Sequence, residues 1–393
     1  MVEEVQGLNS SIQIAQAMES PVKQVGRLHF IDFARGLVMM IMAWDHVSGF
    51  WMQVHGGLEG IFPARNPALD LTLFLARFVS HWCAPTFVFL SGVSLALSIR
   101  KRLGRGDPQR DITLHIIKRG LLLLLFEALL VSPAFDLPYL YFGVIATIGV
   151  GLIIFSVGRR LPTSIILAVS LIIILNHQWL DLSFIPMDVA WGHYLRRILH
   201  EPGFTWPPYF ALYPIIPWIG VMGLGWASGT LLHGFDREKL PRLQLPLAAT
   251  GVGSIALFFL VRWTNGYGNL MRRWSGDIMD WLYVSKYPPS IAFLLWSLGG
   301  MCLFLALGIF IEERNWSRKS VMGAVDTFGR TPLFFYLTHL WLYRLRLPRV
   351  LPPFYLDLAQ TLAFWAVGLV VLWVLCSRYL KLKRKYPRFL QYI

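Results

Sequence analysis

Long apolar stretches separated by short polar segments dominate the pattern of this sequence. Ten of them are about 20 residues long, enough for a helix to cross a hydrocarbon core of roughly 30 Å. They lie near residues 30–52, 71–99, 112–132, 139–158, 163–180, 210–233, 246–263, 289–311, 327–345 and 358–378. The short alternating segments of a β-barrel are absent from the sequence. The pattern predicts an all-α, polytopic integral membrane bundle with about ten transmembrane helices.

Basic residues mark one side of this predicted bundle. They follow the second, fourth, sixth, eighth and tenth stretches, beginning at Arg100, Arg159, Arg237, Arg314 and Lys381. Loops rich in Lys and Arg stay on the cytosolic side of a membrane, so both termini are predicted to be cytosolic. The two longest loops, 181–209 and 264–288, then lie on the outer side.

The chain is predicted to form one membrane domain with two tails. Residues 1–26 lack the basic start and apolar core of a signal peptide, and we interpret them as a cytosolic tail. Residues 27–385 form the transmembrane domain, and residues 386–393 form a cytosolic C-terminal tail.

Composition supports the membrane prediction. Hydrophobic residues make up 55% of the chain and charged residues only 15%, whereas a soluble domain carries about a quarter. The net charge of +14 comes mostly from the short loops, where it indicates topology and contact with anionic lipid rather than nucleic acid. The three cysteines lie in apolar stretches without a CxxC pair, which argues against a disulfide framework and a cysteine metal site.

The first stretch carries four ionisable side chains, Asp32, Arg35, Asp45 and His46. Such residues cost roughly 2.5 kcal/mol or more at the centre of a membrane helix, so they indicate function or a partner. At 100° per residue, Arg35 and His46 are eleven positions apart and lie within about 20° of one helix face. Asp45 points about a quarter-turn away from that face. The polar stripe therefore runs from a cytosolic start to the outer third of the helix.

Other stretches carry polar residues at helical spacing. Arg77 and His81 are four residues apart and are predicted to share a face, with a kink at Pro85. Glu127 interrupts the third stretch near its middle. In the ninth stretch, a polar stripe consists of Tyr336, His339 and Tyr343. Counting 1.5 Å per residue puts His46, His81 and His339 at similar depth, so we expect them to line one cavity.

Each of these residues also has a purely structural interpretation. Asp32 and Arg35 could form an interfacial ion pair, and Arg77 could extend to the outer headgroups. His81 and His339 could hydrogen-bond neighbouring helices, Asp45 could serve a helix other than its own, and Glu127 could pair with a neighbouring Arg or Tyr. No HxxxH or HxxE spacing supports a metal site, and no metal is expected.

Five segments occur in an order that carries a family resemblance. They are RLHFIDFARGLVMMIMAWDH (27–46), ARFVSHWCAPTFVFLSGVSLALS (76–98), YPIIPWIGVMGLGWASG (213–229), VSKYPPSIAFLLWSLGG (284–300) and FGRTPLFFYLTHL (328–340). Together they resemble the bacterial DUF1624 family, which is similar to the catalytic membrane domain of heparan-α-glucosaminide N-acetyltransferase and is related to YeiB-type membrane proteins. The resemblance spans nearly all of residues 27–385.

The resemblance implies acyl transfer across a cell inner membrane. The donor would be cytosolic acetyl-CoA or another acyl-CoA, and the acceptor a sugar amine or hydroxyl of a carbohydrate or glycoconjugate on the outer side. The DH pair of the family maps to Asp45 and His46. The lysosomal enzyme has an asparagine near the position of His46 and its catalytic histidine about eleven residues further on, where this chain has Gly57, with His55 two positions before it. Both His46 and His55 therefore stay candidates for the catalytic histidine.

The same resemblance suggests roles for the remaining candidates. Histidine would act as general base or acyl carrier. The substrate-binding candidates are Arg77, His81, Tyr336, His339 and Glu127, and the candidates for binding acyl-CoA are Arg35, Asp32, Lys286 and Arg330. The expected partners are membrane lipid, acyl-CoA and the acceptor, and a homodimer is one oligomeric state left open.

Two other functions fit the same polar residues. One is a small-molecule transporter, in which they form an intramembrane pathway, although the sequence lacks the paired, broken helices of many transporters. The other is a scaffold in which buried histidines only hold helices together.

Overall fold

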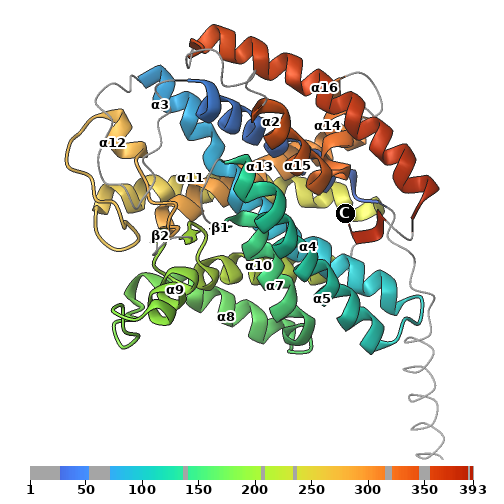
Figure 1. The fold of residues 1–393 in the computed structure, drawn as a ribbon, viewed down its shortest axis with the longest axis horizontal. Coiled ribbons are helices and arrows are strands. Elements are labelled where there is room, and N and C mark those ends of the chain that lie inside the picture. The colour runs from blue at the N-terminus through green and yellow to red at the C-terminus, as the bar shows by residue number, and fades with distance from the viewer. Residues whose placement is uncertain are drawn as a thin grey trace, which may run out of the picture.

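The computed structural model describes residues 27–52, 71–135, 140–204, 209–232, 237–314, 321–344, 355–387 and 390–392. Most of these residues are helical (Figure 1). The predicted tail 1–26 and the candidate His55 lie outside the described residues.

Every one of the ten apolar stretches is largely helical. The long helices are α2 (His29–Trp51), α4 (Cys83–Leu103), α5 (Gln109–Phe126), α7 (Val144–Gly158), α8 (Thr163–Asn176), α10 (Ile215–Leu231), α11 (Gln244–Thr264), α13 (Ile291–Glu313), α15 (Pro332–Arg344) and α16 (Leu358–Lys385). The shorter ones are α3 (Leu71–Phe78), α6 (Ser132–Ala134), α9 (Ala190–Leu199), α12 (Ile278–Leu282) and α14 (Val321–Arg330).

Four helical segments among the described residues are long and apolar enough to cross a membrane, namely Leu71–Leu103, Glu238–Thr264, Ile291–Glu313 and Leu358–Lys385. Val144–Gly158, Thr163–Trp179 and Ile215–Leu231 are shorter apolar helices. Helix α2 has 23 residues, but its ionisable side chains lower its mean hydropathy. A helical membrane protein is therefore supported, and the number of ten spans stays a prediction.

A small sheet corrects the all-α prediction. Strand β1 (Leu140–Phe142) pairs in parallel with β3 (Tyr209–Ala211), and β2 (Gly203–Phe204) pairs antiparallel with β3. Strands β1 and β3 precede α7 and α10, respectively, so these helices begin a few residues later than the apolar pattern predicts. Apolar runs this short do not distinguish a strand from the start of a helix.

Two prolines change the geometry of predicted spans. The ninth stretch is broken between Arg330 and Thr331, because Pro332 lacks the N–H that would continue α14 and instead begins α15. In the second stretch, a 3-10 turn at Val79–Trp82 precedes Pro85, which has no N–H to donate to the carbonyl of His81.

Helix α2 lies at the centre of the bundle. It packs against α4, α13, α14, α15 and α16, and α16 lies along its outer side (Figure 1). By contrast, the outer faces of α8, α11 and α16 expose apolar side chains such as Ile172, Leu260 and Val370. An apolar surface of this kind is expected where a helix faces lipid.

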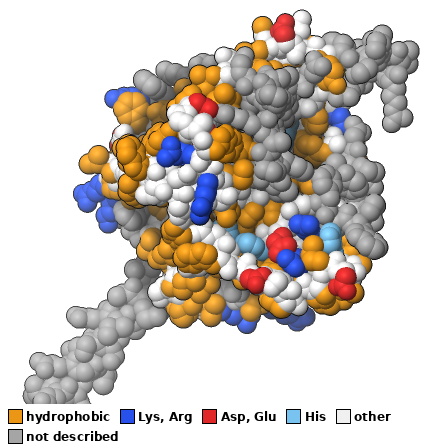
Figure 2. All heavy atoms as spheres, turned by 90° about the vertical axis from the view of Figure 1, so that its left-hand side faces the viewer, with side chains coloured by type: hydrophobic (Ala, Val, Ile, Leu, Met, Phe, Trp, Pro, Cys, Tyr) orange, Lys and Arg blue, Asp and Glu red, His pale blue; other side chains and the backbone are white. Residues whose placement is uncertain are grey.

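The basic segments that follow the even-numbered stretches gather at one end of the molecule. We call it the basic end; there α2 and α5 begin and α4, α13 and α16 finish (Figure 1). The backbone N–H of Phe30 in α2 donates to Glu312 Oε2 at the end of α13, at 3.1 Å. This arrangement agrees with the predicted sidedness of the loops, and which side is cytosolic stays a prediction. Figure 2 looks onto the opposite end, which carries α9 and α12 and mixes charged with hydrophobic side chains.

Candidate active site

The two histidines His46 and His339 are in direct contact. Nδ1 of His46, on α2, lies 2.7 Å from Nε2 of His339, on α15. The rings stack with centroids 5.0 Å apart and an interplanar angle of 15°. His339 is fully buried. Two of the three histidines that were expected to share one cavity therefore meet.

The hydrogen bonds fix which nitrogens carry protons. Nδ1 of His339 lies 3.0 Å from the backbone carbonyl of Phe335. A carbonyl only accepts, so Nδ1 of His339 is the protonated nitrogen and its Nε2 carries the lone pair. Nδ1 of His46 must then donate to that lone pair. The neutral His46 ring is thus held with its own lone pair on Nε2, the atom a general base or nucleophile needs.

Aromatic rings surround His46. The ring of Phe135 lies 5.5 Å away between centroids, and those of Phe50 and Tyr336 lie 6.5 Å away. Tyr336 and Tyr343 of the predicted stripe are both buried beside His339. The end of α2 is also tied to α15, because Trp51 Nε1 donates to the carbonyl of Tyr343 at 2.6 Å. The candidate base therefore lies in a surrounding of low polarity.

The carboxylate of Asp45 is directed to another helix instead of the imidazole beside it in sequence. Its carboxylate pairs with the guanidinium of Arg77, which also donates to the hydroxyl of Ser80. The side chains of Asp45 and Arg77 are both only 13% exposed. The structure thus follows the alternative in which Asp45 serves another helix, joining α2 to α3 and the turn behind it.

The side chains of His81 and Arg77 point to different neighbours. Its Nδ1 donates to the carbonyl of Phe78 at 2.7 Å, and its ring packs on Phe78 and on Phe293 of α13. The expected shared face is lost because the residues between Arg77 and His81 include the 3-10 turn, which advances about 120° per residue instead of 100°. No contact between His81 and the His46–His339 pair is found among the described residues.

Glu127 directly follows α5, and its carboxylate lies against the beginning of α7. It opens a π-helical turn, Glu127–Val131, and its Oε2 accepts the backbone N–H of Ala146 at 2.7 Å. The carboxylate is 2% exposed, and the positive end of the α7 dipole favours a negative charge there. π-Helical turns often occur at functional sites. Tyr141 and Tyr336 lie close enough to Glu127 to interact with it electrostatically. Glu127 therefore lies beside the residues that surround His46, where it caps the beginning of α7.

Lys286 lies far from the other predicted acyl-CoA ligands. It precedes α13 in a short loop, whereas the end of α13 contacts the beginning of α2, and the 23 residues of this helix span about 34 Å. Its ammonium is 5.2 Å from the ring of Tyr287, whose hydroxyl donates to that of Tyr213 at 3.2 Å. Tyr141 lies close enough to both of these tyrosines to interact electrostatically. Lys286 therefore belongs to a group of tyrosines at the opposite end.

The start of α2 carries an ion-pair network at the basic end. Asp32 accepts from Arg27 at 2.5 Å and from Arg35 at 3.2 Å. Arg35 also donates to the carbonyl of Gly329 in α14 at 3.1 Å and to the hydroxyl of Ser94 in α4 at 2.8 Å. The predicted pair of Asp32 and Arg35 exists and is extended to two more helices.

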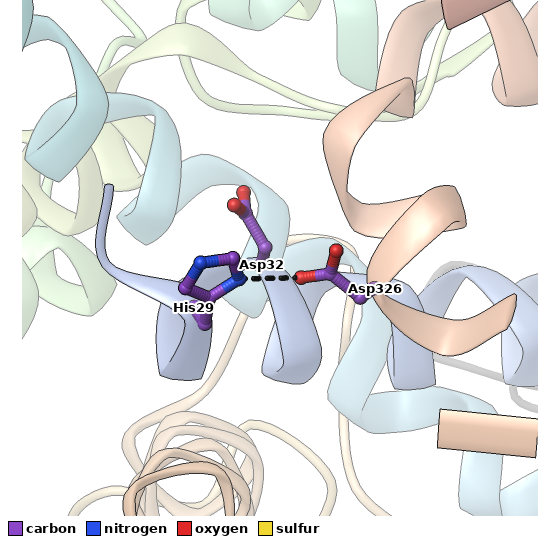
Figure 3. Close-up of side chains that lie close together, drawn as sticks. All are labelled: His29, Asp32 and Asp326. Atoms are coloured by element: carbon purple, nitrogen blue, oxygen red, sulfur yellow. Dashed lines mark hydrogen bonds and ion pairs between the residues drawn. The ribbon is translucent and has the colours of Figure 1, made fainter. Parts of the chain in front are cut away.

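His29, Asp32 and Asp326 lie close together in this network (Figure 3), with ligand-type atoms within 4.8 Å of one another. Nδ1 of His29 contacts Asp326 Oδ1 at 3.1 Å, and Arg330 lies 3.5 Å from the other oxygen of Asp326. Guanidinium groups thus neutralise both carboxylates, because Asp32 is paired as well. These contacts form an ion-pair network between α2 and α14. In a cation site, the same carboxylate oxygens would have to bind the metal instead.

Two further cations join this network, which sequence analysis did not select. Arg119 of α5 lies near Arg35, and Lys383 of α16 lies near both Arg119 and Arg27. We call the five cations Arg27, Arg35, Arg119, Arg330 and Lys383 the basic cluster. Nε of Arg119 and Nε of Arg330 are buried without a hydrogen-bond partner among the described residues. The position of Arg119 inside a predicted span was the signal that could have identified it.

A second histidine pair, also missed by sequence analysis, holds the loop before α13. Nε2 of His177 donates to the carbonyl of Pro289 at 2.9 Å, and its Nδ1 lies 3.1 Å from Nε2 of His200. His200 therefore donates to His177. Burial lowers the pKa of His200, which lies in the loop after α9.

Comparison with known proteins identifies one family. The model of the family described as heparan-alpha-glucosaminide N-acetyltransferase, catalytic, matches residues 27–264. This match covers α2 to α11, including His46, Asp45 and Arg77, and it ends before α13–α16. No curated protein matches the chain significantly.

Proposed function

Because this chain belongs to the heparan-alpha-glucosaminide N-acetyltransferase catalytic family, we propose that it is a multi-pass inner-membrane acyltransferase. It takes an acetyl or other acyl group from cytosolic acyl-CoA and transfers it to a sugar amine or hydroxyl at the outer side. The hydrogen-bond chain from Phe335 through His339 to His46 is the observation that carries this proposal.

In the proposed reaction, Nε2 of His46 is the general base. It takes the proton of the acceptor amine or hydroxyl while the acceptor atom attacks the thioester carbonyl. The C–S bond then breaks, and Nε2 gives its proton to the leaving thiolate, so that CoASH is released and the neutral imidazole is restored. His339 stabilises the intermediate imidazolium by accepting from Nδ1 of His46. Of the substrate-binding candidates, Tyr336 is the one we propose as the donor to the developing oxyanion, because its ring lies near His46 whereas Arg77 and His81 bind Asp45 and Phe78.

The basic cluster is the proposed site for the phosphates of acyl-CoA. Two buried guanidinium donors without partners among the described residues favour an anion there. Arg35 and His46 lie on one face of α2, and eleven helical rises separate them by about 16 Å. A donor bound with its phosphates at the basic cluster would therefore need an arm of this length along α2 to bring its thioester to His46.

The tyrosines near Lys286 are the proposed acceptor site. They lie at the end of the molecule opposite the basic cluster, and their rings offer apolar faces together with hydroxyl groups. This location suits an acceptor that approaches from the outer side.

The test is release of CoASH from acetyl-CoA by purified protein in lipid nanodiscs, with amino sugars as acceptors. His46→Ala should lose the acceptor-dependent release, whereas His115→Ala, which removes a histidine that stacks on Tyr392 at the basic end, should keep it. Equal turnover by His46→Ala and wild type would overturn the proposed base. Uptake of the sugar into proteoliposomes without CoASH release would instead establish the transporter.

A further inference from the structure

A second basic pocket lies at the basic end, outside the basic cluster. It has a volume of about 640 Å³ and is lined by Ala96, Ile99, Arg100, Leu103, Gln109, Arg159, Arg160 and Trp226. These residues come from the end of α4, the beginning of α5, the turn that follows α7 and the second half of α10. The proposed function uses none of them.

The pocket concentrates positive charge that no carboxylate neutralises among the described residues. Arg159 is held by neutral groups: it donates to Gln109 Oε1 at 2.8 Å and to the hydroxyl of Thr113 at 3.0 Å. No ion pair with Arg100 or Arg160 is found in the described part of the chain, and the nearby Asp107 is paired with Arg102 at 3.3 Å. The three guanidinium groups therefore contribute positive charge that no described carboxylate offsets, although most N–H groups of Arg159 already donate to neutral acceptors.

The first turn of α5 adds to this preference. Gln109 is the first residue of this 18-residue helix, whose positive dipole end and unsatisfied N–H groups favour an anion. The hydrogen bonds from Arg159 keep its guanidinium beside that turn. The arginine is thereby oriented before any ligand binds.

The remaining lining is apolar. Ala96, Ile99 and Leu103 of α4 and the indole of Trp226 form it, and the pocket lies where apolar helices end. A small soluble anion gains nothing from contact with these apolar side chains, whereas a phospholipid presents a phosphate together with acyl chains that can pack against them. Basic pockets between membrane helices on the cytosolic side are known to hold anionic headgroups.

We propose that this pocket binds the phosphate headgroup of an anionic phospholipid, with Arg100, Arg159 and Arg160 as its cationic ligands. The lipid comes from the leaflet at the basic end, which is the cytosolic leaflet in the orientation proposed above. Binding is independent of acyl transfer, because the pocket shares no residue with the His46 site or the basic cluster.

The experiment is native mass spectrometry of the full chain with added phosphatidylglycerol. The triple variant Arg100→Gln, Arg159→Gln, Arg160→Gln should weaken retention by about tenfold or more, since it removes three cations that attract an anionic headgroup. The control variant Lys101→Gln, Arg105→Gln, Arg110→Gln removes the same charge from exposed positions of the same surface and should change retention by less than about threefold. Retention of phosphatidylcholine, which has no net charge, should be the same for the wild type and the two triple variants.

Two results would overturn the proposal. One is equal loss of phosphatidylglycerol from both triple variants, which would show that retention depends on the net charge of this surface and not on the three arginines of the pocket. The other is binding of inorganic pyrophosphate or CoA that depends on the three arginines and displaces the lipid, which would assign the pocket to a soluble phosphate. A gel-filtration profile matching that of the wild type shows that the variants are folded, and CoASH release serves as a separate readout of the proposed function.

Discussion

Replacing His339 by phenylalanine separates the orientation of the base from the base itself. The substitution keeps a planar aromatic ring, somewhat larger than imidazole, in a fully buried position, but it removes the nitrogen that accepts from Nδ1 of His46 at 2.7 Å. The basic cluster, eleven residues back along α2, is not touched. We expect a large fall in kcat with little change in the KM for acetyl-CoA.

The size of the fall follows from two contributions. A hydrogen bond contributes about 0.5–1.5 kcal/mol net, so its loss lowers the ratio of the His46 tautomer with the lone pair on Nε2 to the other tautomer by about two- to tenfold. A ring that is free to rotate also loses part of the general-base contribution, which amounts to about 10²–10⁴ in rate. Together they predict a kcat reduced by about 10² or more. The buried N–H left without its acceptor also destabilises the fold by about 1–3 kcal/mol.

The assay is the initial rate of CoASH release at saturating acceptor, with acetyl-CoA varied and the folded fraction measured by gel filtration. His115→Phe is the matched control, because its ring stacks on Tyr392 at a centroid distance of 4.8 Å near the basic end. A folded His339→Phe protein that keeps kcat within about twofold of the wild type would refute the orienting role. A rise in KM at unchanged kcat would show that His339 contacts the donor instead.

Three further predictions concern other parts of the molecule. Arg119→Gln should raise the KM for acetyl-CoA by about tenfold or more, as expected for one lost charge-assisted hydrogen bond, while the exposed Arg105→Gln should not. Gly329→Ala should lower the melting temperature and raise the same KM, because a Cβ there would lie 1.7 Å from a backbone oxygen of α2 and force α14 away; an unchanged melting temperature would contradict this close packing. Burial lowers the pKa of His200, so the unfolded chain takes up a proton below about pH 6.5 that the folded loop resists, and stability falls as the pH drops through that value. His200→Gln, which keeps a donor, should flatten the dependence of the melting temperature between about pH 7 and pH 5, and an equal slope would argue against this assignment.

The helical segments and the faces of α2 were predictable because they depend on local periodicity. The 100° rule placed Arg35 and His46 on one face and Asp45 on another, and the contacts of Asp45 with Arg77 agree with it. The rule failed for His81 because a proline changes the winding of the preceding turn.

Convergence of distant residues was not predictable in the same way. Lys383 was interpreted as part of a topology signal, and only the packing of α16 brings it near Arg119. Conversely, Lys286 was grouped with Arg35 by motif, although the length of α13 separates them. Sequence gives the depth of a residue along its own helix but does not say which helices are neighbours.

The contact between His46 and His339 joins residues 293 positions apart, one inside the region matched by the family and one beyond it. A change in either ring alters what the other must donate or accept. Across homologous chains, the two positions should therefore be exchanged together, and a pair such as asparagine with histidine would preserve one donor and one acceptor. Coupled substitution at these two alignment columns would record the hydrogen bond as an evolutionary constraint.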